Sequence, residues 1–150
     1  MNKIDALSKH LKAKRIIGID YGLKRVGLAV CDELHIAITP LTVLSPNENG
    51  FWDNLLKIFY NEKVSAVVVG VPLRLDNEKT EVILKIEEFI GNLKEKTSME
   101  ILTFDESFST HRSVETMISI GKKKKKRSKK GSKDLVAAAI ILRDFLDELD

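Results

Sequence analysis

The stretch RIIGIDYGLKRVGLAVC, residues 15–31, holds two apolar runs separated by a short turn. The first run, 15–20, is apolar up to its final acid, which is typical of a strand buried on both faces. Residues 21–24, with Gly22, predict a turn into a second strand over 25–31. So short a connection requires antiparallel pairing. We therefore expect a hairpin whose first strand lies centrally in a sheet.

Outward from the hairpin, helix and strand patterns alternate. The expected elements are a short helix over 4–12, the hairpin, a strand over 36–44, a helix over 48–62, a strand over 64–71, a helix over 78–96, a strand over 99–105, a helix from Ser109 or Thr110 to Gly121, and a final helix that Asp134 opens. Pro40 confines its strand to an edge or a bulge, and Asn77 is the expected N-cap of its helix. Crossovers require the later strands to pair in parallel. This order predicts an α/β fold with a mixed five-stranded sheet and helices on both faces.

Composition indicates one globular domain over residues 1–150. The 150 residues are 43% hydrophobic and 31% charged, and this length is within the roughly 100–200 residues of one domain. One cysteine, Cys31, excludes an intramolecular disulfide framework and fits a reducing compartment. The longest apolar runs, 64–73 and 135–142, are far shorter than the roughly 20 residues of a membrane helix, and residues 1–15 lack the apolar core of a signal peptide. We expect a cytoplasmic protein without a membrane partner.

Positive charge is concentrated in one segment, which we call the basic tract, KKKKKRSKKGSK at 122–133. It holds eight lysines, one arginine and no acid, whereas the rest of the chain has 16 basic and 22 acidic residues. Such a tract is a candidate contact for nucleic acid or another polyanion, and a solvated loop is the alternative.

Three acids have positions that favour chemistry. Asp20 ends the first strand, Glu106 follows the strand over 99–105, and Asp134 opens the last helix. Each has a structural explanation, respectively an Asx turn, a surface acid and a helix N-terminal acid. However, sites in open α/β sheets form at the carboxyl ends of parallel strands, where these acids would converge. Carboxylates without interleaved Lys or His favour Mg²⁺ or Mn²⁺, and three can hold two ions about 3.5–4 Å apart for phosphodiester hydrolysis.

Four blocks in order resemble the signature of the YqgF/RuvX family: IGIDYGLKRVGLAVCD (17–32), VVVGVPLRLD (67–76), DESFST (105–110) and KDLVAAAIILRDFLD (133–147). The family comprises pre-16S rRNA nucleases, also described as Holliday-junction-resolvase-like, with a ribonuclease H-like fold. The resemblance implies that Asp20, Glu106 and Asp134 are the catalytic, metal-binding acids and that the cofactor is Mg²⁺ or Mn²⁺, as two ions.

The chain departs from the family pattern at two positions. Ser107 replaces the arginine of the usual DERxST block, and Leu23 stands where the family often has Thr or Ser. If the family arginine contacts phosphate, this chain needs another cation. The candidate nucleic-acid-binding residues are Lys24, Arg25, Arg112, Lys122, Lys123, Lys124, Lys125, Lys126, Arg127, Lys129 and Lys130.

These observations predict a metal-dependent endonuclease of structured nucleic acid that processes the 5′ end of pre-16S rRNA, as a monomer or a weak homodimer. A Holliday-junction-type DNA resolvase is one alternative, and a non-catalytic RNA-binding maturation factor is another. An actin-like ATPase shares the strand–Asp–x–Gly hairpin, but that architecture needs two such domains and this chain has the length of one.

Overall fold

The computed structural model describes residues 3–72, 80–106 and 129–149, with the backbone alone for 129–134. Its elements are α1 (Lys3–Leu11), β1 (Ile16–Tyr21), β2 (Val26–Cys31), β3 (Ile38–Leu44), α2 (Phe51–Asn61), β4 (Ala66–Val71), α3 (Glu81–Lys96), β5 (Glu100–Asp105) and α5 (Lys129–Leu149). Each lies within a few residues of its predicted position. The helix predicted over 109–121 falls outside the described residues.

The five strands form one mixed sheet in the order β3-β2-β1-β4-β5. β1 pairs antiparallel with β2, which confirms the hairpin, and the Gly22 N–H closes the turn by donating to the Arg25 carbonyl at 2.9 Å. β4 pairs parallel with both β1 and β5, as the crossover argument required. β3 is an edge strand whose register shifts opposite Pro40, so the prediction from that proline is confirmed.

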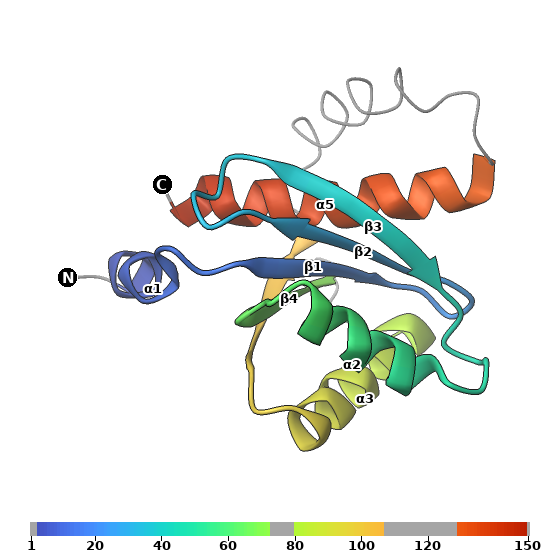
Figure 1. Cartoon of the computed structure of the whole chain (residues 1–150). Coiled ribbons are helices and arrows are strands. Elements are labelled where there is room, and N and C mark those ends of the chain that lie inside the picture. Colours follow the sequence, from blue (N-terminus) through green and yellow to red (C-terminus); the bar gives the residue numbers. More distant parts are fainter. Residues whose placement is uncertain (1–2, 73–79, 107–128, 150) are drawn as a thin grey trace.

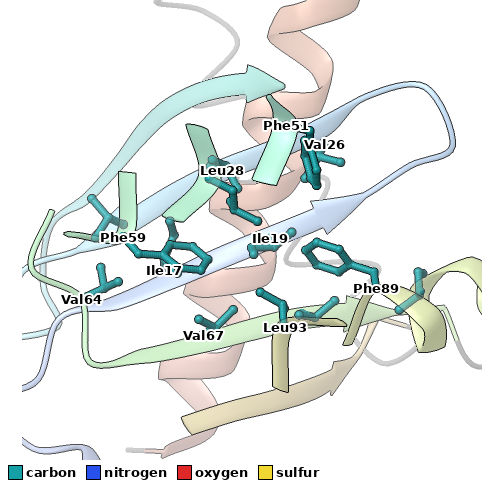
Figure 2. Close-up of a cluster of buried hydrophobic side chains, with 14 residues drawn as sticks. Ile17, Ile19, Val26, Leu28, Phe51, Phe59, Val64, Val67, Phe89 and Leu93 are labelled. Atoms are coloured by element: carbon teal, nitrogen blue, oxygen red, sulfur yellow. The ribbon is translucent and has the colours of Figure 1, made fainter. Parts of the chain in front are cut away.

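Helices cover both faces of the sheet, with α5 on one side and α2 and α3 on the other (Figure 1). Alternation along β1 produces the two layers: Ile17 and Ile19 pack with α2 and α3, while Ile16 packs with α5. Figure 2 shows the first layer, in which Phe51, Phe89 and their neighbours fill the space over β1 and β4. The predicted α/β fold class is confirmed.

Gly18 allows α5 to approach the centre of the sheet closely. A Cβ at this position of β1 would stand 2.9 Å from the Leu142 Cβ and 3.1 Å from the Ala138 carbonyl oxygen. The helix backbone therefore approaches β1 closely at Gly18, while on either side of this point apolar side chains such as Ile16 and Val68 pack between the sheet and α5.

Two predicted helix starts are wrong. Thr80, and not Asn77, caps α3, because its Oγ1 accepts from the Ile83 N–H at 3.3 Å. α5 begins at Lys129, so Asp134 lies inside the helix and the last part of the basic tract is helical. Lysine is a good helix former, and the following apolar stripe extends the helix backward through it.

Among the described residues, no helix combines the length and the apolar character that crossing a bilayer requires.

Candidate active site at one edge of the sheet

The carboxyl ends of β1, β4 and β5 meet at one edge of the sheet, because the three strands run in parallel. Asp20 lies near the end of β1, one residue beyond the pair that Ile19 makes with Val69. Its side chain lies on the α5 face, since Ile19 and Tyr21 on either side pack against the opposite layer.

Glu106 follows β5 directly and reaches back across the end of β4. A Cβ built on Gly70 would collide with the Glu106 Oε1 and would stand 2.6 Å from the Ile141 Cδ1 of α5. Because Gly70 has no side chain, the Glu106 carboxylate occupies the space between β4 and α5, on the side of β4 where β1 carries Asp20. Glu106 is thus half-buried between β4 and α5.

The charge of Asp20 acts on Glu106. Burial raises the pKa of Glu106 from 4.5 to about 7, with further contributions from the negative charges of Asp20 and Asp105. Desolvation and like charge both disfavour the ionised carboxylate, so the cluster holds negative charge at a cost that a bound cation would offset.

Sequence reasoning missed two residues of this site. Asp105, the last residue of β5, adds a negative charge that raises the Glu106 pKa, but it is not part of the donor pair because Phe104 before it packs on the α5 face and alternation puts Asp105 on the other. Gly70 contributes by lacking a side chain, and its position inside the β-branched run VVVGV was the available signal, because a glycine within a strand often marks a close approach.

The third predicted acid, Asp134, lies within α5, four residues before Ala138 and seven before Ile141, so helical spacing puts these positions on one face. Its side chain is outside the described atoms. Among the residues that the structure describes, no group of three His, Cys, Asp or Glu side chains is arranged to hold a metal ion. The described donor set is therefore the pair Asp20 and Glu106.

Of the predicted basic residues, Lys24 and Arg25 are exposed on the hairpin turn that follows Asp20. Arg25 lines a cavity of about 250 Å³ together with Ser45, Glu48 and Asn54, next to the start of α2. Lys129 and Lys130 lie in the first turn of α5. The others fall outside the described residues, as does Ser107: Arg112, Lys122, Lys123, Lys124, Lys125, Lys126 and Arg127.

A carboxylate pair on a half-buried edge can bind a hard cation through oxygen ligands. The pair fits Mg²⁺ or Mn²⁺ by the chemistry of its oxygen donors, and a bound cation would offset both the burial and the like charge that raise the Glu106 pKa. Two exposed cations, Lys24 and Arg25, lie on the hairpin turn that follows β1.

Two solved structures share this fold. The chain superposes on Thermus thermophilus RuvC in complex with a Holliday junction substrate with a TM-score of 0.59 and 16% identity, over 86% of this chain and 90% of that one. It superposes on the fowlpox virus Holliday junction resolvase with a TM-score of 0.56 and 13% identity, over 89% and 98% of the two chains. At these identities the likeness establishes a ribonuclease H-like, resolvase-type fold.

Sequence relatives cover nearly the whole chain. A protein of Christiangramia forsetii named "Putative pre-16S rRNA nuclease" is 40% identical over 89% of this chain and 98% of its own. One of the same name from Sulfurihydrogenibium is 36% identical over 90% and 91%. The family model described as "RuvX: Holliday junction resolvase" matches residues 14–148, a span that begins just before β1 and ends in the last turn of α5. With its sheet, its acidic edge and this match in agreement, the chain belongs to the RuvX family.

Proposed function

We propose that this protein is a nuclease that hydrolyses phosphodiester bonds of structured nucleic acid at the edge formed by β1, β4 and β5. The observation that carries the proposal is geometric: the Glu106 carboxylate fills the space over Gly70 on the face and at the edge of the sheet where β1 carries Asp20, although the two acids lie far apart in the sequence. A structural acid does not need a second carboxylate beside it. Two carboxylates at one edge supply the oxygen ligands that Mg²⁺ and Mn²⁺ prefer.

Asp20 and Glu106 would hold the cation, with Asp134 of α5 as the third ligand that we propose. When bound, two Mg²⁺ or Mn²⁺ ions supply an activated water and stabilise the leaving oxygen. The protein contributes the fixed carboxylates, and α5 packs against Gly18 and thereby sets the distance between helix and sheet. Lys24 and Arg25 would bind backbone phosphates beside the scissile bond.

For the substrate, we propose the 5′ region of a 16S rRNA precursor, processed in the cytoplasm. The names of the sequence relatives support this choice. A four-way DNA junction is the second candidate, supported by the family description and by the RuvC complex. The dense positive charge of the basic tract suits either duplex-containing substrate, since phosphate contacts carry no sequence information. We propose that the single-domain chain acts as a monomer or a weak homodimer.

The proposal is tested by incubating the purified protein with a labelled pre-rRNA fragment and with a four-way DNA junction, each in Mn²⁺ and in EDTA. We expect site-specific cleavage of the RNA in Mn²⁺ alone. Cleavage of the junction and not of the RNA would move the assignment to the second candidate. Tight binding of RNA without cleavage, unchanged in an Asp20→Asn variant, would indicate a non-catalytic maturation factor.

The matched control is Asp53→Asn, which makes the same chemical change on the exposed face of α2. It should cleave at the wild-type rate, whereas Asp20→Asn should lose several orders of magnitude. Equal activity of the two variants would exclude Asp20 from the mechanism.

A further inference from the structure

Three aromatic rings form a ladder on the face of the sheet opposite the acids. Tyr21 lies on Phe89 with ring centroids 4.6 Å apart and planes 31° apart, and Phe89 lies on Trp52 with centroids 5.4 Å apart and planes 27° apart. Tyr21 is the last residue of β1 and directly follows Asp20. The ladder therefore begins at the same strand end as the acidic site and continues on the other side of the sheet.

A cavity of about 210 Å³ opens beside this ladder. Its walls include the rings of Tyr21 and Trp52, both half-buried, and its polar side chains are Asn47, Lys85, Glu88 and Asn92. The residues that line the cavity come from β1, the loop before α2, α2 and α3, so tertiary packing alone assembles it. Asn47 is held in place because its Nδ2 donates to the Leu23 carbonyl at 3.2 Å.

The lining favours a flat heterocycle with hydrogen-bonding edges. Tyr21 and Trp52 already pack against Phe89, so a flat ring in the cavity would extend this aromatic cluster, and the two Asn amides offer both donors and acceptors to its edge. The Lys85 Nζ lies 3.7 Å from the Glu88 Oε2, and the Lys96 Nζ lies over the Trp52 ring at 5.3 Å from its centroid, so these two cations already have partners in the protein. The cavity is smaller than the roughly 300–1,000 Å³ of pockets for drug-sized ligands, which limits the occupant to about one ring system.

We propose that this pocket, lined by Tyr21, Trp52, Asn47 and Asn92, receives one unpaired base of the nucleic acid whose backbone passes Asp20. The inference rests on the proposed function, because it takes the substrate to be nucleic acid. The base must be unpaired, since only an unstacked base exposes a face to protein rings. The pocket thus selects substrates with a single-stranded or distorted position, while the phosphate contacts select no sequence.

The chain contains one tryptophan, Trp52, so intrinsic fluorescence reports on this pocket without any label in the protein. The probes are a short end-labelled single-stranded RNA and an abasic strand of equal length and charge, both in EDTA to prevent cleavage. Anisotropy of the strand label measures binding, and tryptophan emission is recorded at saturation. We expect both strands to bind and only the strand with bases to quench Trp52. Equal emission with the two strands, or RNA binding with unchanged emission, would overturn the proposal.

Variants separate the pocket from simple packing. Asn92→Leu keeps the side-chain size and removes the amide, and should weaken RNA binding about fivefold to tenfold. Tyr21→Leu removes one stacking surface and should weaken it about tenfold or more. Neither should change binding of the abasic strand. The control Tyr60→Leu removes an aromatic ring from the same α2 at a site that is 83% exposed, and should change neither. Loss of abasic-strand binding in parallel with RNA binding would show structural damage and overturn the assignment.

The two proposals fail separately. Base-dependent quenching without cleavage in Mn²⁺ would overturn the nuclease and keep the pocket. Cleavage without quenching would overturn the pocket and keep the nuclease. Asp20→Asn protein should still show the quenching, because Asp20 lies on the other face of the sheet.

Discussion

The Glu106 carboxylate occupies the place where a side chain on Gly70 would stand. The acid that follows β5 thereby reaches across β4, beneath Ile141 of α5, to the strand end that carries Asp20. The geometry of the acidic edge depends on a side chain that is missing from the middle strand of the three.

Gly70→Ala should therefore disable the site. The new methyl group would collide with the Glu106 carboxylate and with the Ile141 Cδ1, 2.6 Å away. We expect displacement of Glu106 to lower kcat for Mn²⁺-dependent cleavage by about 10²-fold, and overpacking to cost about 1–3 kcal/mol of the free energy of unfolding. Single-turnover kinetics and urea unfolding measure the two effects.

Gly91→Ala is the matched control for this substitution. A Cβ at this exposed position of α3 would meet nothing within 4 Å. Because alanine favours a helix over glycine, this variant should gain about 0.5–1 kcal/mol and keep full activity. A Gly70→Ala protein as active as Gly91→Ala would contradict the role assigned to Gly70.

Stability in EDTA should depend on pH through Glu106. Its pKa is raised from 4.5 to about 7, mainly by burial, so the folded protein holds this proton more tightly than the unfolded chain does. The free energy of unfolding should therefore fall as the pH rises from about 4.5 to about 7 and then level off, by up to about 3 kcal/mol. Glu106→Gln should remove this decrease and be more stable than wild type at about pH 8. Urea unfolding across this range tests the sign.

The control for the pH dependence is Glu33→Gln, the same change in the exposed loop between β2 and β3. Its curve should parallel that of wild type. If Glu106→Gln and wild type run parallel as well, the Glu106 carboxylate does not carry the repulsion inferred for it.

Divalent cations should stabilise the folded protein through Asp20. Mn²⁺ that binds only the native state adds about 2.7 kcal/mol at a hundredfold excess over its Kd. In EDTA, the Asp20→Asn protein should melt at a higher temperature than wild type because the substitution relieves the repulsion on Glu106. In Mn²⁺, the variant should lose most of the stabilisation that the ion gives to wild type. Four melting curves test this. If the variant melts at a lower temperature than wild type in EDTA and is stabilised by Mn²⁺ as much as wild type is, Asp20 is a structural acid.

The basic tract should determine the salt dependence of binding. Replacing Lys122, Lys123, Lys124, Lys125 and Lys126 with Ser should weaken binding of unrelated sequences equally, because phosphate contacts do not distinguish bases. The slope of log K against log salt should flatten by roughly 0.9 for each lost contact on duplex. Anisotropy titrations at several salt concentrations measure this slope. An unchanged slope would show that the basic tract does not contact the phosphates.

The sequence by itself was sufficient to predict the order of the elements, the mixed sheet and the edge where the acids gather. These features follow from local signals: the two apolar runs around Gly22 predict a hairpin, Pro40 predicts an edge strand with a bulge, and helix-length crossovers require parallel pairing. Because parallel strands end at the same edge, Asp20 and Glu106 could be assigned to one side of the sheet from strand order alone.

Only the tertiary structure determined how those residues meet. The space over Gly70, the raised pKa of Glu106 and the pocket beside Trp52 all arise between segments that lie far apart in the chain. The two wrong helix starts have the same physical reason. Thr80 caps α3 in place of the predicted Asn77, and α5 begins before Asp134, because packing of the apolar helix face fixes where each helix begins. Periodicity reports which face of an element is apolar. It does not report which atoms of another element fill the space beside a glycine, because that depends on long-range packing of the sheet and both helix layers.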